Sequence, residues 1–402
     1  MTDSFKAAGY SWKLFCGDEV IEAHLTDTVK RAGANRAFVI CSPSINKATD
    51  LVHRIALTLG DRFAGCFGGI ENDSTYISVQ AATDAALAAK ADLLIAVGGG
   101  SVMVATRAVA IFLAETGSPF ELMTQYPKAG GRPHSPRLMA PKLPIINIPT
   151  TPTSAMNRAG TGLKNPELDQ RMEYFDPKTR PQAILIDDAA LMSVPASVLH
   201  STATTVFCGV IANAAQPASN PLVEADQQQA RQLACDAYLA GPQALAQVEH
   251  RRNLALAAFL QNRAEDDGRK LVRASAFGGD YAVSTALHLF QPAIGQGEST
   301  CVLVASALRL AKQVPSDELL RVGRALGVQD RSPTVDNIAE ALEATFAKNK
   351  MPIQLRTLPV TEADLPKIAG ETVNNFNAIA GGGTQDAQAR VDRSLRLLQA
   401  AW

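Results

Sequence analysis

A glycine-rich segment, Gly98-Gly99-Gly100-Ser101, stands between an apolar run and a helical pattern. Glycines at such a turn let backbone N–H groups approach a phosphate, and the start of the helix adds a partial positive charge. The segment is not the G-x-G-x-x-G dinucleotide fingerprint, which is found nowhere in the chain. The pattern predicts a phosphate-binding turn. The alternative is a tight strand-to-helix turn without a ligand, since glycine is common in such turns.

A second motif, Ile148-Pro149-Thr150-Thr151, closes another apolar run. Open parallel sheets bind ligands at the carboxyl ends of their strands, where two adjacent hydroxyls can bond ribose or adenine groups. Threonine is also frequent in ordinary turns, so the motif alone indicates little. Its position after the glycine segment favours a nucleotide site.

The elements that must position these residues alternate in the first half of the chain. Apolar runs at 37–41, 93–97, 144–148 and 182–187 are separated by helical stretches, which predicts a parallel sheet covered on both faces. The second half reads almost entirely as helix, with Asn220-Pro221 as one helix start and Gly241-Pro242 as its stop. We therefore expect an α/β nucleotide-binding domain over residues 1–190 and an all-helical domain over 191–402.

The composition excludes several classes of protein. A chain of 402 residues is too long for one core, and its net charge of −1 leaves no basic excess for nucleic acid. We expect no signal peptide and no membrane span, because no apolar run is long enough. Six scattered cysteines without a CxxC pair indicate reduced thiols and a cytoplasmic protein.

The order of these features resembles the iron-containing alcohol dehydrogenases, whose relatives include glycerol dehydrogenase, maleylacetate reductase and dehydroquinate synthase. Arg171, Pro181 and Asp187 keep the family's intervals of ten and sixteen residues. The resemblance implies a dehydroquinate synthase-like fold, NAD(P) as cofactor, a small-molecule substrate in the cleft between the domains, and a possible homodimer. The residues that it implies in cofactor binding are Ser42, Gly98, Gly99, Gly100, Ser101, Thr150, Thr151, Ser154 and Arg171.

The metal ligands of the family are not kept. Its members usually hold one metal with an Asp and three His. Counted from Asp187 and Pro195, the first two positions fall on Thr205 and Gly209. With His288 as the anchor the later pair falls on Ser284 and Glu298, and a register two residues earlier would give Ala282 and Gln296. Only Glu298 would bind iron or zinc well, so we expect no tightly bound metal. A different metal site from His200, Cys208, His288 and Glu298 stays open as an alternative, although no pair has the usual helical spacing of ligands.

The cofactor side departs from the family as well. Ser42 stands where the family often has an Asp that bonds ribose hydroxyls and repels a 2′-phosphate. Val104 and Arg107 replace an Asp and a Lys that usually follow the glycine segment. We expect NADPH to bind at least as well as NADH, with Arg107 adding attraction for the 2′-phosphate.

These observations predict an NAD(P)-dependent oxidoreductase that acts on an alcohol, aldehyde or ketone without the family metal. In place of the metal, His288, Ser284 or Thr205 would stabilise the alkoxide, and Glu298 would hold His288 in its charged form. The alternative is a catalytically altered or inactive relative that serves as a non-redox enzyme or a binding protein, because fold does not fix function.

Overall fold

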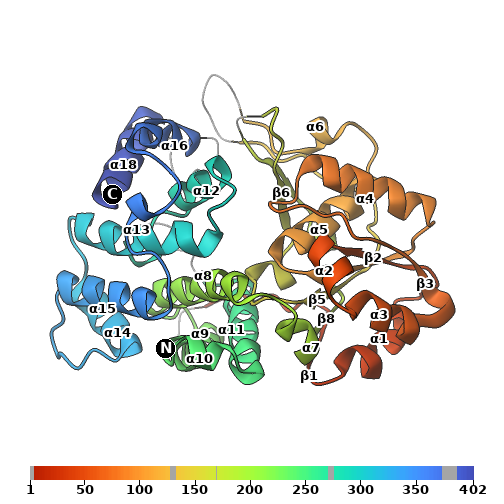
Figure 1. Ribbon diagram of the computed structural model, residues 1–402, viewed down its shortest axis with the longest axis horizontal. Coiled ribbons are helices and arrows are strands. Elements are labelled where there is room, and N and C mark those ends of the chain that lie inside the picture. The colour runs from red at the N-terminus through yellow and green to blue at the C-terminus, as the bar shows by residue number, and fades with distance from the viewer. Residues whose placement is uncertain (1–3, 127–132, 169, 270–275, 374–386) are drawn as a thin grey trace. The chain divides into compact units, whose positions relative to one another are not determined.

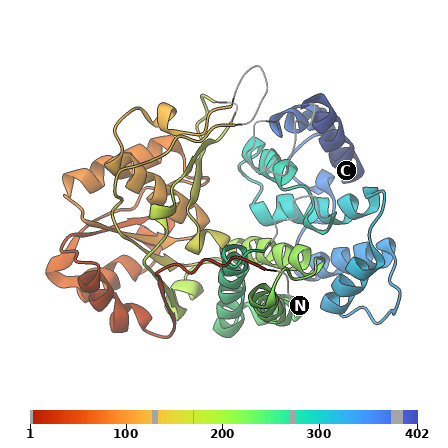
Figure 2. The ribbon, with the colours of Figure 1, turned by 180° about the vertical axis from the view of Figure 1, so that it is seen from behind.

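The computed structural model describes residues 4–126, 133–168, 170–269, 276–373 and 387–402. Contacts within the chain divide it into two units. We call Tyr10–Val194 the α/β unit, and Met1–Gly9 with Pro195–Trp402 the helical unit. The grouping of the N-terminal segment with the helices was not indicated by the sequence. It rests on contacts such as the hydrogen bond from the Ala8 amide to the Asp266 carbonyl, and Figure 2 shows the segment beside these helices.

The α/β unit is built on a six-stranded, fully parallel sheet in the order β1-β8-β5-β4-β2-β3. Its strands are β1 (Lys13–Gly17), β2 (Ala37–Cys41), β3 (Phe63–Phe67), β4 (Leu93–Gly98), β5 (Ile145–Pro149) and β8 (Ala183–Asp187). The four predicted strands are β2, β4, β5 and β8, whose residues are all buried. The two strands that the sequence did not indicate are the half-buried edges, β1 and β3.

Helices cover both faces of this sheet, as the near-continuous apolar strands predicted. Helices α1 and α3 pack on one face, and α4 and α5 on the other (Figure 1). The helices of the unit are α1 (Val20–Arg31), α2 (Pro43–Ala48), α3 (Leu51–Leu59), α4 (Tyr76–Ala88), α5 (Gly100–Ala114), α6 (Pro119–Leu122) and α7 (Asp188–Met192). An antiparallel hairpin of β6 (Gly160–Leu163) and β7 (Met172–Phe175) completes the unit.

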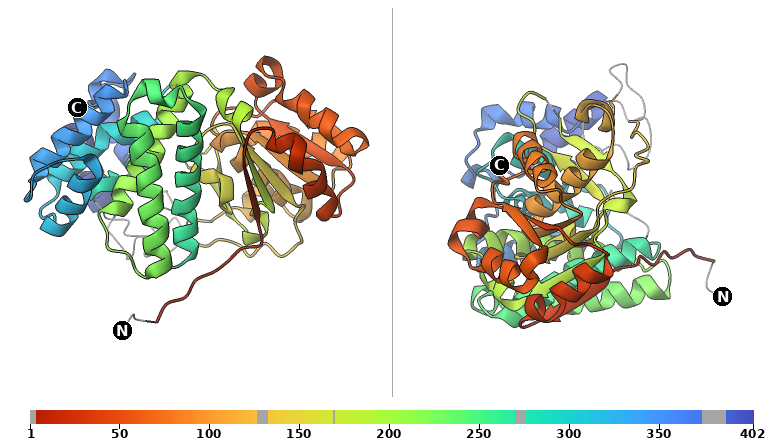
Figure 3. Two further views of the ribbon diagram at one scale, coloured as in Figure 1. Left: turned by 90° about the horizontal axis from the view of Figure 1, so that it is seen from below. Right: turned by 90° about the vertical axis from the view of Figure 1, so that its right-hand side faces the viewer.

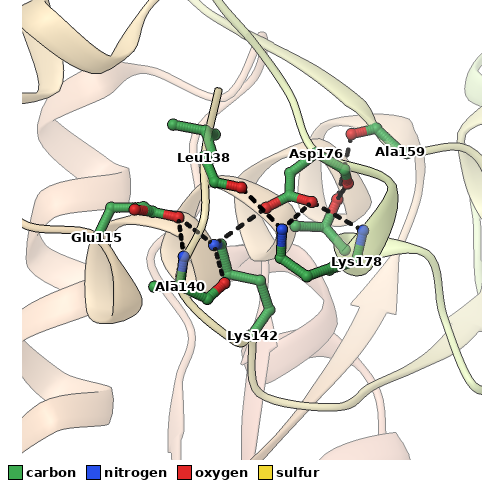
Figure 4. Close-up of polar contacts among 8 residues, drawn as sticks. Glu115, Leu138, Ala140, Lys142, Ala159, Asp176 and Lys178 are labelled. Carbon is green, nitrogen blue, oxygen red and sulfur yellow. Dashed lines mark hydrogen bonds and ion pairs between the residues drawn. The ribbon is translucent and has the colours of Figure 1, made fainter. Parts of the chain in front are cut away.

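A buried ionic cluster ties the hairpin and the loop before β5 to the end of α5 (Figure 4). The Lys142 ammonium is fully buried and lies 2.5 Å from Glu115 Oε1 and 3.0 Å from Asp176 Oδ2. It also donates to the Ala140 carbonyl, at 2.7 Å. Asp176, itself 1% exposed, pairs in addition with Lys178 at 3.0 Å. Each charge in the cluster therefore has an opposite charge beside it, as burial requires.

The helical unit confirms the predicted all-α second half. Its helices are α8 (Ala196–Ala214), α9 (Pro221–Leu239), α10 (Pro242–Leu245), α11 (Val248–Asp266), α12 (Tyr281–Phe290), α13 (Gln296–Leu310), α14 (Ser316–Leu326), α15 (Val335–Lys348), α16 (Leu365–Glu371) and α18 (Ala387–Ala400). As predicted, Asn220 caps α9, accepting from the amides of Leu222 and Val223 at 3.0 and 3.1 Å. Helices α9 and α11 run side by side (Figure 3). Among the described residues, no helix combines the length and the apolar character that a membrane crossing requires.

Candidate functional site

The two predicted nucleotide motifs lie next to each other at the carboxyl edge of the sheet. Strands β4 and β5 are neighbours, and the Thr150 amide donates to the Gly98 carbonyl at 3.0 Å. Ser42 follows β2 on the other side of β4. Because β3 lies outside β2 and β4 inside it, the direction of winding reverses between β2 and β4. Such a switch point is where open α/β sheets bind their ligands.

The glycine turn is closely packed at Gly98 and half-buried at Gly99. A Cβ on Gly98, whose φ is +156°, would lie 2.7 Å from the Val102 side chain, so this position needs glycine for folding. A Cβ on Gly99 would lie 3.2 Å from the Thr151 hydroxyl. That hydroxyl is buried and has no hydrogen-bond partner among the described residues. An orphaned hydroxyl beside bare backbone at the start of a 15-residue helix fits a phosphate.

Ser101 is fixed by a strained turn that comes before α4. Asp73 and Ser74 both have left-handed backbone, with φ of +61° and +53°. The Asp73 amide donates to Ser101 Oγ at 3.2 Å, and Ser74 Oγ donates to the Ser101 carbonyl at 2.7 Å. Arg171 lies 4.0 Å from the Asp73 carboxylate. The turn therefore connects two predicted binding residues, Ser101 and Arg171, whose sequence positions gave no sign of this link.

Ser42 caps α2, with its hydroxyl accepting from the Ile45 amide at 3.5 Å and sharing a 3.0 Å hydrogen bond with Ser44. Ser154 is exposed and begins a short 3₁₀ turn, Ser154–Asn157, after the threonines. Both positions are accessible at the carboxyl edge of the sheet, where they were expected.

The expectation for Arg107 is wrong. Its side chain is 2% exposed and donates to the carbonyls of Ala155 and Arg158 at 2.6 and 3.0 Å. Burial, with the nearby positive charges of Arg158 and Arg180, lowers the pKa of Arg107 to about 9. Arg107 stabilises the turn after β5 by these hydrogen bonds. Its buried guanidinium is not accessible to a 2′-phosphate.

In the helical unit, two of the family's metal positions lie on α8 without ligand groups. Thr205 Oγ1 donates back to the Ser201 carbonyl at 3.2 Å, one helical turn earlier. At Gly209, a Cβ would lie 2.7 Å from Gln261 Oε1, so the Gln261 amide occupies the space beside this position. That oxygen accepts from the Asn213 amide at 3.1 Å.

The other two metal positions lie on α12 and α13 and are held by hydrogen bonds. Ser284 is 2% exposed and shares hydrogen bonds of 2.9 Å with Ser299 and with Thr300. Glu298 Oε2 accepts from Ser201 Oγ at 2.5 Å. This contact depends on close helix approach, since a Cβ on Gly297 would lie 2.1 Å from the Ser201 carbonyl.

Ser201 therefore contacts both Thr205 and Glu298. Ser284 hydrogen-bonds Ser299, the residue that follows Glu298. His288 is half-buried in the last turn of α12, four residues after Ser284. Glu298 accepts a hydrogen bond from Ser201. The pairing of Glu298 with His288 stays a prediction.

The residues present do not fit the family metal. Of the four positions, only Glu298 carries a ligand group, and its carboxylate is engaged by Ser201. Within the described ranges, no group of three or more His, Cys, Asp or Glu side chains is arranged to hold a metal, which includes the alternative set around His200. Burial, followed by the charges of Lys350 and Arg251, lowers the pKa of His200, while burial raises that of Cys208 to about 12.

Comparison with known proteins shows what the chain is similar to. The profile of the iron-containing alcohol dehydrogenases matches residues 12–188. Maleylacetate reductase 2 of Cupriavidus pinatubonensis is 29% identical over 194 residues, which are 48% of this chain and 45% of that protein. Lactaldehyde reductase of Escherichia coli is 23% identical over 390 residues, covering 94% and 95% of the two chains.

The fold likeness extends over the whole chain. An archaeal alcohol dehydrogenase from a Red Sea brine pool superposes with a TM-score of 0.83 at 16% identity and covers 100% of both chains. The chain is therefore similar to the iron-containing alcohol dehydrogenases, whose family model matches residues 12–188. The positions that this resemblance assigns to the metal ligands carry other residues.

Proposed function

We propose that the protein is an NAD(P)-dependent oxidoreductase that interconverts an alcohol and an aldehyde or ketone without the family metal. The observation that carries the proposal is the buried Thr151 hydroxyl beside Gly99 at the start of α5, which has no hydrogen-bond partner within the described ranges. Buried hydroxyls without a protein partner are rare, and such a group indicates a site where a ligand or water binds. A cofactor phosphate meets this need together with the backbone amides of the turn.

The residues of the α/β unit would hold the cofactor at its pyrophosphate and at one ribose. Gly98, Gly99, Gly100 and Ser101 contact the pyrophosphate, and Ser42 contacts the ribose beside β2. Ser101 Oγ accepts from the Asp73 amide, so its hydroxyl proton remains to be donated to a phosphate oxygen. Thr150, Ser154 and Arg171 line the remainder of the binding surface. Bound nicotinamide supplies or accepts the hydride.

The helical unit would supply the proton and the polar environment. We assign the proton donor to His288, a half-buried residue in the last turn of α12, because imidazole is the side chain that most often transfers protons in catalysis. Ser284, Thr205 and Glu298 keep the neighbouring faces of α8, α12 and α13 polar through hydroxyl and carboxylate groups. Hydrogen-bond donors would then polarise the substrate oxygen where relatives use a Lewis acid.

A second candidate is a binding protein that has lost turnover. It is favoured by the same contacts that fill the metal positions, above all the Gln261 amide at Gly209 and the Ser201–Glu298 hydrogen bond. Such a protein would keep the nucleotide site of the α/β unit and lack an electrophile for the substrate.

One experiment separates the two candidates. The purified chain is titrated with NADPH and NADH by nicotinamide fluorescence, then assayed with small aldehydes and ketones, including the substrates that name the two relatives, lactaldehyde and maleylacetate. Binding with turnover supports the oxidoreductase. Binding without turnover on the whole panel supports the second candidate, and no binding to either nucleotide overturns the proposal.

A further inference from the structure

Two cysteines lie side by side at the edge of the nucleotide site. Cys41 is the last residue of β2 and precedes Ser42, while Cys66 lies on the adjacent strand β3. Their Sγ atoms are 3.7 Å apart, within the range of a thiol hydrogen bond. The mechanism proposed above uses neither thiol.

The two thiols differ in the way that an attacking and a resolving cysteine differ. Cys41 is fully buried, whereas Cys66 is half-buried on the outermost strand, so a small oxidant reaches Cys66 first. The hydrogen bond from Cys41 lowers the pKa of the Cys66 thiol, although burial opposes this effect. The thiolate is the reactive form, and a neighbouring thiol allows it to form a disulfide.

We propose that Cys41 and Cys66 form a reversible disulfide on reaction with a peroxide, and that this disulfide weakens nucleotide binding at the end of β2. The first step moves one oxygen of the peroxide to the Cys66 thiolate, which becomes a sulfenic acid, and releases water after protonation. The Cys41 thiol then attacks the Cys66 sulfur and releases a second water. In total two thiols lose two electrons and two protons, the peroxide is reduced, and a dithiol reductant reverses the change.

Forming the bond requires the sulfur atoms to close from 3.7 Å to about 2.05 Å. Strand β3 is able to supply this movement because it pairs only with β2. Its pairing already contains a register shift between Ala37 and Phe38 of β2, and Gly65 within it has a φ of +131°. Strand β2 is fixed between β3 and β4, so β3 is the strand that moves.

The segment after β3 transmits this movement to Ser42. The Ile70 amide donates to the Cys41 carbonyl at 3.1 Å, which fastens the segment to the end of β2. The backbone of Gly68 lies against α2 so closely that a Cβ there would be 2.4 Å from Asn46 Nδ2. A shift of β3 toward β2 therefore pushes on α2, whose N-cap is Ser42. Ser42 is the expected ribose contact, so this second half of the inference rests on the proposed function.

Peptide mass spectrometry tests the disulfide directly. The full-length reduced protein is treated with hydrogen peroxide, free thiols are alkylated, and the protein is cleaved with trypsin. Each cysteine lies alone in its peptide, residues 37–47 and 63–90. We expect these peptides to be linked in the wild type, separate after dithiothreitol, and separate in Cys66→Ser. The matched control is Cys16→Ser, which removes an exposed cysteine from β1 and should leave the link intact.

Nucleotide titration of the same samples tests the coupling. Oxidised wild type should bind NADPH about tenfold more weakly than the reduced protein, a typical size for coupled sites, and Cys66→Ser should show no change on oxidation. Oxidation of Cys66 to a sulfinic acid without linked peptides overturns the disulfide. Linked peptides with unchanged NADPH affinity overturn the coupling. If the reduced wild type binds no nucleotide, the proposed function fails, and the linked peptides alone decide on the disulfide.

Discussion

At the scale of single residues, neighbouring side chains determine why the proposed nucleotide site needs glycine at two adjacent positions. Gly99 is needed because the Thr151 hydroxyl lies 3.2 Å from where a Cβ would be, and not because of its backbone, whose φ is −83°. Gly98 is needed for the opposite reason, since a side chain there would strike Val102. We therefore expect separate functions for these neighbouring glycines, binding at Gly99 and folding at Gly98.

This difference predicts the outcome of Gly99→Val. The valine side chain would occupy the space between Thr151 and the helix start, so NADPH binding should fall by at least about 100-fold, comparable with the loss of a close charge-assisted contact. The fold should survive, because the backbone conformation suits valine. Fluorescence titration measures binding and circular dichroism measures folding, with Gly370→Val, which meets no atom within 4 Å, as the control. A folded Gly99→Val variant with normal NADPH binding would show that the segment is only a turn.

Ser42→Asp should change the choice of cofactor. Asp is as good an N-cap as Ser, so α2 is expected to remain capped. The new carboxylate repels a 2′-phosphate and bonds ribose hydroxyls, so the affinity for NADPH should drop by about tenfold or more while that for NADH holds or rises. Comparing the two dissociation constants in variant and wild type is the measurement. A wild type that already prefers NADH strongly would show that another residue excludes the phosphate.

At the scale of elements, the buried cluster around Lys142 fixes the segments that lead into β5 and β7. Burial alone would raise the pKa of Asp176, but hydrogen bonds from the Lys178 amide and from Lys142 lower it overall. The pKa of Glu115 is likewise lowered, because the contacts with Lys142 outweigh its burial. Both carboxylates therefore contribute stability that is present above their unfolded pKa values, near 4, and is lost as the pH falls through the lower folded values.

Lys142→Met should consequently destabilise the α/β unit. Removing one partner of a buried ion pair leaves Asp176 and Glu115 without their shared cation, at a cost of about 3 kcal/mol. The matched control is Lys178→Met, which removes another cation that pairs with Asp176. Because the Lys178 side chain is 41% exposed, its loss should lower the free energy of unfolding by less than about 1 kcal/mol. Urea unfolding at pH 7 and at pH 4 measures both. Equal losses for the two variants would contradict the importance of burial.

The sequence predicted those elements whose burial produces a recognisable pattern of apolar residues. It did not predict contacts between residues that lie far apart in the chain. Strands buried on both faces are continuous apolar runs, so β2, β4, β5 and β8 were found, while the half-buried edge strands were not. The glycine turn and the threonines were found because each is a local motif. Ser201 and Gln261 were missed because their partners lie far along the chain, 97 residues away for Glu298. Gly295 and Gly297 are the sequence signal that could have indicated this contact, because glycines there allow α8 to approach the start of α13.

At the scale of the whole molecule, the two units differ in how far they match the family model. The family profile matches residues 12–188, which lie in the α/β unit, while the likeness of fold covers the full chain. The positions that the resemblance assigns to the metal ligands all lie in the helical unit, outside the residues that the family model matches. The residues at these positions make contacts within the unit. The Gln261 side chain lies against Gly209, and Ser201 donates a hydrogen bond to Glu298.

This argument predicts that the purified protein carries well under one iron or zinc per chain. Thr205, Gly209 and Ser284 offer no strong ligand, and a single carboxylate that already accepts a 2.5 Å hydrogen bond binds a transition metal weakly. Elemental analysis of freshly purified protein, with an iron-containing relative prepared in parallel as the positive control, is the measurement. A chelator should leave reductase activity unchanged in this protein and abolish it in the relative. One tightly bound metal per chain, or loss of activity with the chelator, would mean that ligands outside the four aligned positions hold a metal. The proton-donor assignment of His288 would then have to be replaced by metal activation of the substrate oxygen.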